Sequence, residues 1–448
     1  APGFRMHIAP SEGESRDVAG PVMDMLFPDS TPRRISIAAI TGTNGKTTTT
    51  RMLAHIMKTA GHIVGFTTTD GVYIDGHLTL KGDMTGPKSA QMVLRDPDVD
   101  MAVLETARGG IVRSGLGFGR SDVAACLNIS ADHLGLKGID TLEQLAEVKR
   151  VVIETASNTA VLNADDEHCL RMADYSKAEH LCYVTMNPTH ELVKQHIQAG
   201  GKAVVLEKGI NGDMITFYDN GAHIPLLWTH LIPATLEGKA VHNVQNAMFA
   251  AGIAYCMEKE LDAIRHGLQT FTQTFFQAPG KMNIFEEHPF KVILDYAHNP
   301  SGMRALQKFT NNIPASLKVG IIAGIGDRRA EDTIALGRIA AEMFDEIIIR
   351  MDKCLRGRTE EELRKMLEEG IKSVDINKKT TIIPSEIEAL TYAMNTAPHN
   401  ALIVLCSDEV RETISLMNNF KEQESQGVNY FQINNSIETK PLEKQLYN

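Results

Sequence analysis

The stretch Thr41-Gly-Thr-Asn-Gly-Lys-Thr-Thr48 constrains the fold more than any other part of this chain. The run 35–40 before it is short, apolar and β-branched, which is typical of a buried strand. After it, apolar residues recur at helical spacing until Gly61, where a helix can end. A glycine loop between a strand and a helix N-terminus can bind phosphate, because its backbone N–H groups and the helix dipole face the anion. The spacing therefore predicts a nucleoside triphosphate site, with Lys46 at the outer phosphates and Thr47 able to hold Mg²⁺.

One departure and one alternative accompany this interpretation. The common phosphate-binding pattern has glycine at position 40, where this chain has Ile40. An ordinary glycine-rich turn would account for the two glycines of the stretch. It would not account for Gly-Lys-Thr in register at the start of a helix, so we retain the nucleotide site.

Length and composition agree with a nucleotide-binding protein of several domains. At 448 residues the chain can hold two or three domains, each with its own core. Its 43% hydrophobic and 23% charged residues are typical of globular proteins. The net charge of -11 argues against nucleic acid as a main partner. No apolar stretch is long enough to span a bilayer and we find no signal peptide, so we expect no membrane partner.

Cysteine usage indicates a reducing compartment. The six cysteines are scattered, with no C-x-x-C pair. Cys126 and Cys406 lie inside apolar, strand-like runs, which predicts reduced thiols in the core. We therefore expect a cytoplasmic protein.

Changes in composition divide the chain into four expected parts. Residues 1–32 lack a starting methionine and are rich in Pro, Ser and Gly, which suggests a linker from an upstream region. Ala278-Pro-Gly280 is a natural break, and the last residues are rich in Asn, Gln and Glu. The expected parts are a linker over 1–32, a central ATP-binding domain over 33–277, a second α/β domain over 278–420 and a polar tail over 421–448.

Both domains are predicted to be α/β. Strands alternating with helices imply a parallel sheet covered on both faces. In the first domain, further buried strands are predicted at 101–104, 123–129 and 159–163. Segments 203–206 and 214–218, separated by Asn211-Gly212, predict a small β insertion, and a helix carrying Asn243 and Asn246 follows. The strands predicted for the second, doubly wound domain are 291–295, 318–323, 346–350, 380–383 and 401–406.

Two polar residues near strand ends are candidates for metal binding. Glu105 ends the strand 101–104, and His133 follows the strand 123–129. Because the carboxyl ends of parallel strands meet at one edge of a sheet, both residues can reach a Mg²⁺ ion bound to the nucleotide. Taken singly, His133 favours a hydrogen-bonded loop histidine over a ligand, and Glu105 is compatible with a helix cap or a solvated acid. Their positions after consecutive predicted strands of one sheet shift the balance toward function. A third residue, Lys149, lies on a predicted helix, and composition alone favours a solvated lysine there.

Several motifs, in this order along the chain, together resemble the Mur ligase superfamily. They are Thr-Gly-Thr-Asn-Gly-Lys-Thr-Thr, Asn128-Ile-Ser-Ala-Asp-His133, Lys149, Asn243-x-x-Asn246 and Asp295-Tyr-Ala-His-Asn-Pro300. Three further stretches resemble the Mur-like half of the cyanophycin synthetases, namely Glu105-Thr-Ala-Arg-Gly-Gly110, Gly326-Asp-Arg-Arg329 and Asp352-Lys-Cys-Leu-Arg-Gly-Arg358. The resemblance covers roughly residues 33–420, and the opening of the chain is similar to the exit from the ATP-grasp half that precedes the Mur-like half in that family.

The resemblance implies a fold and a reaction. The fold is a P-loop central ATPase domain with a parallel sheet and a small β insertion, followed by a Rossmann-like α/β domain. The reaction uses ATP and Mg²⁺ to convert a carboxylate into an acyl phosphate, from which an amine displaces phosphate. Such chemistry needs positioning and charge neutralisation more than covalent work by the protein.

The resemblance also implies roles for individual residues. Lys46, Lys149, His133 and Glu105 would be catalytic. ATP would bind to Gly42, Thr43, Asn44, Gly45, Lys46, Thr47, Thr48, Asn243, Asn246, Asp295, His298, Asn299, Asp327 and Arg328. Metal ions would bind to Thr47, Glu105, His133 and Lys149, the last as a carbamate, which is an anion. Lys281 stands where the family usually has arginine, and the ammonium of a lysine cannot make the bidentate contact of a guanidinium there.

For the cyanophycin synthetases, the Mur-like half joins the arginine α-amine to the β-carboxylate of the terminal aspartate of a poly-Asp/Arg chain. The expected partners are this cyanophycin chain, free arginine and the covalently linked ATP-grasp half, in a homo-oligomer. Arg108 and Arg113 are candidates to hold polymer carboxylates, and surface ion pairs are an equal alternative. Asp352 is a candidate for the guanidinium of incoming arginine, with Arg356 and Arg358 beside it.

Two other functions remain open from the sequence. Another Mur-type ligase could add an amino acid to a cell-wall precursor or glutamate to folate, but we see no room for the N-terminal domain that binds the uridine nucleotide in most Mur ligases. A non-catalytic, Mur-like scaffold half would be expected to have lost site residues. None of the five positions that such a half would lose has changed: Lys46, Thr47, Glu105, His133 and Lys149.

Overall fold

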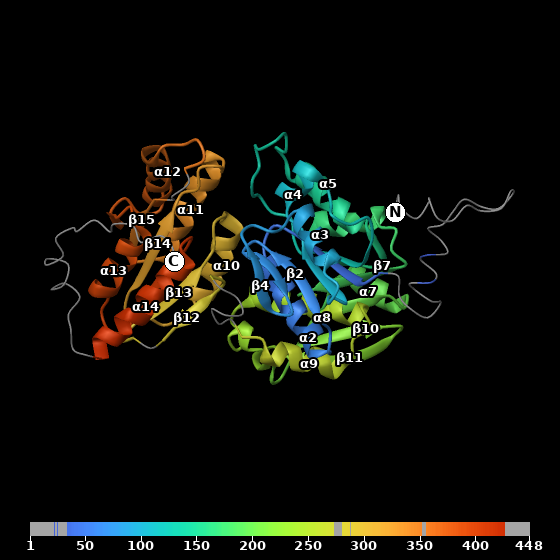
Figure 1. Ribbon diagram of the computed structural model, residues 1–448. Coiled ribbons are helices and arrows are strands. Elements are labelled where there is room, and N and C mark those ends of the chain that lie inside the picture. Colours follow the sequence, from blue (N-terminus) through green and yellow to red (C-terminus); the bar gives the residue numbers. More distant parts are fainter. Residues whose placement is uncertain are drawn as a thin grey trace, which may run out of the picture.

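The computed structural model of the protein describes residues 34–272, 280–286, 288–351 and 355–425, together with Val22 and Met25. These residues form two α/β units that lie side by side, the first blue to yellow-green and the second yellow to red (Figure 1). Nearly all of the expected linker, the Ala278-Pro279 part of the expected break and the tail beyond 425 lie outside the described residues. The domain boundaries therefore stay predictions.

The first unit is built on an eleven-stranded sheet whose central strands are parallel. In order across the sheet, the strands are β11 (Ala222–Trp228), β10 (Gly212–Asp219), β9 (Lys202–Gly209), β8 (His180–Thr185), β7 (Ala156–Asn163), β6 (Ser121–Cys126), β1 (Ser36–Thr41), β5 (Met101–Glu105), β2 (Val64–Thr68), β3 (Gly71–Ile74) and β4 (His77–Lys81). Strands β3 and β4 at one edge and β10 and β11 at the other are antiparallel to their neighbours. The β insertion predicted around Asn211-Gly212 is present, and it extends the central sheet.

Strand β1 explains why the phosphate loop sits at the centre of this unit. It pairs with β5 on one side and β6 on the other, so both of its faces are covered by helices. Side chains alternate along it, and Ile40 packs with the core on one face while Ala39 packs with the core on the other. Its register places Ile40 opposite Glu105, beside the start of the loop.

Helices cover both faces of the large sheet (Figure 1). One core contains residues of α2 (Lys46–Thr59), α8 (Val241–Cys256) and α9 (Leu261–Thr270). The opposite side carries α5 (Leu142–Ile153), α6 (Glu167–Leu170) and α7 (Glu191–Gln198), with α3 (Pro87–Arg95) and α4 (Arg108–Ser114) near β5 and β2. Short 3-10 helices are η2 (Arg171–Tyr175), η3 (Thr229–Leu231) and η4 (Pro233–Thr235).

The second unit has a six-stranded sheet in the order β12 (Asn283–Phe285), β13 (Lys291–Asp295), β17 (Leu402–Cys406), β14 (Lys318–Ala323), β15 (Glu346–Arg350) and β16 (Lys379–Ile382). All pairs are parallel except β12 with β13. One face is covered by α10 (Pro300–Thr310), α11 (Ala330–Met343) and α12 (Glu360–Lys372), and the other by α13 (Glu386–Thr396) and α14 (Val410–Ser425). The five strands predicted for this unit are confirmed to within one residue at each end.

Two general findings bear on the expectations. The five described cysteines are unpaired by disulfides and buried, as predicted for Cys126 and Cys406. Within the described ranges, none of the helices combines the length and the apolar composition that crossing a bilayer requires.

Candidate active site

The phosphate loop adopts a conformation that requires its glycines. Gly45 has a φ of 86°, in the left-handed region that side chains disfavour. A Cβ atom on Gly45 would also come within 2.3 Å of Asn246 Oδ1 on α8. The neighbouring helix α8 therefore packs directly against the loop, and the loop leads its N–H groups to the start of α2.

Asn128, just after β6, fixes this loop from the other side. Its Oδ1 accepts hydrogen bonds from the backbone N–H groups of Thr43 at 3.2 Å and Asn44 at 2.8 Å. Its Nδ2 donates to the Asn44 carbonyl at 3.0 Å, and its own carbonyl accepts from Thr43 N at 2.9 Å. The sequence placed Asn128 in a motif without assigning it a role, and the structure shows that it holds the loop in shape.

Lys46, Thr47 and Glu105 meet at the start of α2. Lys46 Nζ donates to the Thr43 carbonyl at 2.8 Å, and Thr47 Oγ1 donates to Glu105 Oε2 at 2.9 Å. Glu105 is only 2% exposed, and its Oε1 has no hydrogen-bond partner among the described residues. Burial raises the pKa of the Glu105 carboxyl, and the charge of Lys46 and the Thr47 hydrogen bond only partly offset this. A buried carboxylate oxygen beside a hydroxyl suits a hard cation with oxygen ligands.

The same region lacks a preformed metal cage. Among the described residues, no group of three or more His, Cys, Asp and Glu side chains is gathered closely enough to hold a metal ion. Magnesium at nucleotide sites is usually bound through one or two carboxylates plus phosphate oxygens and water. The Thr47–Glu105 pair fits that mode, in which the nucleotide supplies the remaining ligands.

Lys149 is buried, contrary to the solvated lysine that composition favours. It is 3% exposed, and its Nζ donates to Thr43 Oγ1 at 2.9 Å. Leu145, Lys149 and Val152 recur at helical spacing on the face of α5 that packs on the sheet, which is the physical reason for the burial. Burial, with a further contribution from the charge of Lys46, lowers the pKa of Lys149 from 10.5 to about 7.

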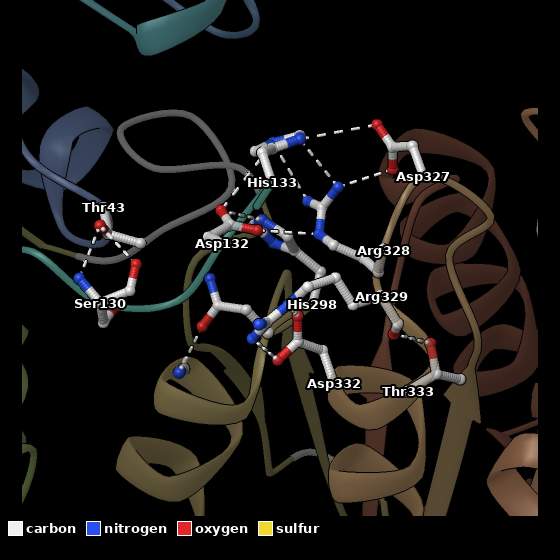
Figure 2. A network of polar contacts seen from close by, with 12 residues as sticks. Thr43, Ser130, Asp132, His133, His298, Asp327, Arg328, Arg329, Asp332 and Thr333 are labelled. Carbon is white, nitrogen blue, oxygen red and sulfur yellow. Dashed lines mark hydrogen bonds and ion pairs between the residues drawn. The ribbon is translucent and has the colours of Figure 1, made fainter. Parts of the chain in front are cut away.

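The two units meet in a network of charged side chains next to this site (Figure 2). Arg328, on the loop after β14, forms an ion pair with Asp132 of the first unit at 2.8 Å, measured from Nε to Oδ1. His298 Nε2 lies 3.6 Å from the other Asp132 oxygen. Burial alone would raise the pKa of the Asp132 carboxyl, but the hydrogen bond and charge of His298 and the charge of Arg328 hold it well below its usual range.

His133 and Asp327 complete the network. Arg328 Nη1 lies 2.9 Å from His133 Nδ1, and the His133 backbone has a φ of 56°. Asp327 accepts from Arg328 Nη1 at its Oδ1 and from Arg356 Nη1 at its Oδ2, both at 2.6 Å. Burial alone would raise the pKa of Asp327, yet these cations and His133 lower it well below its usual range. No role was predicted for Asp132, although its position next to His133, after a strand end, was a usable signal.

Two cavities have residues of the phosphate loop in their linings. The smaller one, of about 320 Å³, contains the loop, Glu105, Asn243, Asn246 and Asp295 in its lining. The larger one, of about 680 Å³, is lined by cationic side chains of both units and by several carboxylates. The residues that line both cavities are Thr43, Lys46, Thr69, Lys281, Tyr296 and His298. The end of the phosphate site is therefore also a wall of the larger cavity.

Most of the predicted nucleotide residues line one or both of these cavities. The smaller cavity is lined by Gly45, Thr47, Thr48, Asn243, Asn246 and Asp295, and the larger one by Gly42, Asp327 and Arg328. Both cavities are lined by Thr43, Lys46 and His298. Asn243 is 1% exposed and its side chain donates to the Ala234 carbonyl at 3.0 Å, while Asn246 donates to Asn243 at 3.0 Å. Asn44 lines the smaller cavity and pairs with Asn299, the N-cap of α10, across the unit boundary at 3.0 and 3.3 Å. Lys281 lies near Glu105 and Asp295, whose charges oppose the lowering of its pKa by burial.

The predicted substrate residues divide into three groups. Arg108, Arg113 and Arg356 line the larger cavity, and the buried Nε of Arg108 has no hydrogen-bond partner among the described residues. Arg358 is not part of this lining, because its guanidinium donates to the carbonyls of Gly326 at 3.2 Å and Arg328 at 3.0 Å. Asp352 lies outside the described residues.

The comparisons with known proteins agree with this architecture. Residues 40–254 match the family model described as "Mur ligase middle domain", and residues 280–408 match the one described as "Mur ligase, glutamate ligase domain". Together the two matches span most of the chain, which therefore belongs to the Mur ligase family.

Comparison with individual proteins shows a more specific similarity within this family. The chain is 46% identical over 429 residues to a cyanophycin synthetase of Trichormus variabilis, covering 93% of this chain and 46% of that protein. It is 45% identical over 419 residues to a cyanophycin synthetase of Synechocystis sp., covering 93% of this chain and 47% of that protein. The chain thus spans about half the length of these curated relatives. Among solved structures, the chain is similar to a bifunctional folylpolyglutamate synthase/dihydrofolate synthase with Mn, AMPPNP and L-glutamate bound. The TM-score is 0.62 at 20% sequence identity, and the match covers 86% of this chain and 89% of that one. At this identity the likeness shows the fold alone.

Proposed function

We propose that this chain is an ATP-dependent amide ligase that joins the α-amine of arginine to the β-carboxylate of the terminal aspartate of a cyanophycin chain. The observation that carries the proposal is the meeting of two cavities at Lys46 and Thr43, one built on a phosphate loop and the other rich in cations. A phosphoryl donor in the first cavity would have its terminal phosphate at the wall of the second. The relatives named cyanophycin synthetases support the choice of substrate.

The residues of the smaller cavity fit ATP with Mg²⁺. The loop N–H groups and Lys46 bind phosphate oxygens, and Thr47 with the unpartnered Glu105 Oε1 would hold the cation. When bound, the cation neutralises charge on the phosphates. Lys46 acts where charge develops on the transferred phosphoryl group, a role in which a preorganised donor is worth about 3 kcal/mol.

The larger cavity would present the acceptor. Arg108, whose Nε has no hydrogen-bond partner among the described residues, orients one carboxylate of the polymer. Arg113, in the last turn of α4, binds a neighbouring carboxylate of the polymer. The β-carboxylate oxygen attacks the terminal phosphorus of ATP and ADP leaves, which gives an acyl phosphate. The neutral α-amine of arginine then attacks the acyl carbon, inorganic phosphate leaves, and the amine proton passes to solvent or to a phosphate oxygen. The contacts of Asp132 with Arg328 and His298 keep the second unit over the reacting groups and so exclude water.

Lys149 and His133 are proposed to hold a second cation. Because the pKa of Lys149 is about 7, much of its amine is neutral at physiological pH and able to add CO₂. The resulting carbamate is an anion within reach of Thr43, whereas the ring of His133 approaches Arg328. His133 can therefore bind a cation only after Arg328 releases it.

The remaining parts of the proposal concern the whole protein. An upstream, ATP-grasp-like half is supported by the share of the relatives that the chain leaves unmatched. A homo-oligomer and a cytoplasmic location stay predictions, the latter in line with the reduced thiols. Asp352 and Arg356 remain proposed contacts of the incoming arginine.

The test measures phosphate release from ATP with a cyanophycin primer that ends in aspartate, comparing arginine, lysine and ornithine. We expect phosphate release that needs both primer and arginine, and a primer lengthened by one arginine. With ¹⁸O in the terminal β-carboxylate, one labelled oxygen should appear in the released phosphate. Phosphate without label would exclude the acyl phosphate, and activity only with glutamate and a folate acceptor would replace cyanophycin as the substrate.

A further inference from the structure

We propose that Asp408 binds the guanidinium group of the incoming arginine and thereby selects the amine substrate. This inference rests on the proposed function and deepens it, because it assigns the side-chain subsite to a residue with no role so far. Asp408 lies in the loop between β17 and α14, at the carboxyl end of a central strand of the second sheet. It forms part of the lining of the larger cavity, and 32% of its side chain is exposed.

A buried carboxylate holds the Asp408 loop in one conformation. Glu386, at the start of α13, is 2% exposed and accepts hydrogen bonds from the backbone N–H groups of Asp408 at 3.0 Å and Glu409 at 3.2 Å. It also accepts from the hydroxyls of Ser407 at 2.6 Å and Thr413 at 3.0 Å. The backbone that carries Asp408 is thus fixed by contacts independent of its own side chain, which is the preorganisation that a selective subsite needs.

The charges of Glu386, Asp408 and the neighbouring Arg350 do not cancel. Arg350 is buried and lies between the two carboxylates, with its Nε 3.2 Å from Glu386 Oε2 and its Nη2 2.8 Å from Asp408 Oδ2. Its Nη2 also donates to the Cys406 carbonyl at 2.6 Å. One guanidinium and two carboxylates leave one net negative charge among these three side chains. Asp408 is the only one of the three that reaches the cavity, so the cavity senses this charge there.

Two other carboxylates of the same cavity are already paired with arginine. Asp327 is bound through both oxygens by Arg328 and Arg356. Asp132 contacts Arg328 through one oxygen and a histidine through the other. Arg350, by contrast, donates a hydrogen bond to one oxygen of Asp408, and among the described residues no second cation is paired with Asp408.

Asp70 and Asp83, both on the first unit, are the remaining carboxylates. Asp70 accepts from Thr68 through Oδ1 and from Tyr73 through Oδ2, and it pairs with Arg51. Asp83 is exposed and accepts from Thr85 through Oδ1. Asp83 lies on the wall that also carries Arg108 and Arg113, which we assign to the polymer. Asp408, on the opposite unit, is therefore the carboxylate placed to receive a separate amine substrate, and Asp83 is the matched control.

The chemistry of the side chain determines what the subsite distinguishes. A guanidinium offers a planar fork of N–H donors and a positive charge, while citrulline offers the same shape without the charge. A carboxylate with one unneutralised charge favours arginine over citrulline, and its directional oxygens favour arginine over lysine. Replacing Asp408 by asparagine keeps an oxygen for Arg350 but removes the negative charge.

The experiment measures steady-state phosphate release by wild type, Asp408→Asn, Asp83→Asn and Asp352→Asn with primer and ATP, using arginine, lysine and citrulline. For Asp408→Asn we expect the KM for arginine to rise at least tenfold, the preference for arginine over citrulline to fall at least tenfold, and the KM values for ATP and primer to stay within twofold. Unchanged arginine-to-citrulline preference in Asp408→Asn would overturn the assignment, as would the same shift in Asp83→Asn or Asp352→Asn instead. If wild type shows no arginine-dependent release, the proposed function itself fails, which separates the two cases.

Discussion

Replacing Lys149 by methionine is expected to abolish turnover while stabilising the protein in CO₂-free buffer. Burial lowers the pKa of Lys149 from 10.5 to about 7, and at about 1.4 kcal/mol per pKa unit the protonated amine costs the folded state roughly 5 kcal/mol. Between these two pH values the unfolded chain binds the proton more strongly than the folded one. The free energy of unfolding therefore rises as the pH increases from about 7 to 10.5, and the cost is present in full below pH 7. Methionine has a similar length to lysine, can occupy the same buried position on α5 and carries no charge.

Carbamylation would remove the same cost in the wild type, which provides the control. We expect bicarbonate to raise the thermal unfolding temperature of the wild type at pH 7.5 and to leave that of Lys149→Met unchanged. In CO₂-free buffer the variant should unfold at the higher temperature of the two. Because the chain has two units, unfolding temperatures are compared directly rather than through a two-state fit. A smaller variant, Lys149→Ala, should be nearly inactive and should regain part of its activity with short carboxylic acids.

Three results would refute this reasoning. A Lys149→Met protein with wild-type turnover would show that no anion is needed at this position. Equal responses of both proteins to bicarbonate would show that the amine does not take up CO₂, and a variant less stable than the wild type in CO₂-free buffer would show that burial of Lys149 carries no such penalty.

Three further predictions concern the loop and the network between the units. Lys46→Ala should lower phosphate release by about a hundredfold or more, from the loss of about 3 kcal/mol at the transferred phosphoryl group, with an unchanged unfolding temperature; near-normal release would remove the nucleotide assignment. Asn128→Ala should raise the KM for ATP about thirtyfold or more, because two or more hydrogen bonds to the loop are lost at about 1 kcal/mol each, and equal KM values would show that the loop holds its shape alone. Arg328→Met should enlarge the radius of gyration in X-ray scattering and lower turnover, because it leaves Asp132 buried without its cation. The control variant Arg329→Met breaks ion pairs within the second unit and should change neither quantity. Identical scattering curves for the two variants would count against closure through Asp132.

How much of the fold the sequence predicts depends on burial. Strands such as β14 and β15 are central and covered on both faces, so they appear as unbroken apolar runs with visible ends. Strand β4 is an edge strand with every residue exposed, and it carries no such signal. Strand β2 was also not predicted, although it is buried, because its sequence Val-Gly-Phe-Thr-Thr contains glycine and two hydroxyl side chains.

The site was predictable where a motif places the chemistry within one segment. The loop and Glu105 belong to this class, since a strand, its end and the following helix are local features. Asn128 binds the loop across 84 residues of sequence, and Asp132 meets Arg328 across the boundary between units, so no spacing rule reveals either contact. Lys149 is an intermediate case, because its helical spacing with Leu145 and Val152 is visible in the sequence, yet composition alone favoured a solvated lysine and that expectation was wrong.

The contact between Asn44 and Asn299 has a consequence for how the two units cooperate. Asn44 belongs to the phosphate loop, and Asn299 caps α10 of the second unit through its Oδ1. The two amides exchange hydrogen bonds at 3.0 and 3.3 Å, so the closed arrangement of the units includes one particular orientation of a loop side chain. A ligand that stabilises this loop conformation must, by linkage, also favour closure, and closure must raise the affinity of the loop for that ligand by the same factor. The larger cavity has walls from both units, so its full lining exists only in this closed arrangement. Filling the phosphate site therefore helps to assemble the second cavity, which makes an acceptor carboxylate and an amine bind best when the nucleotide is already in place.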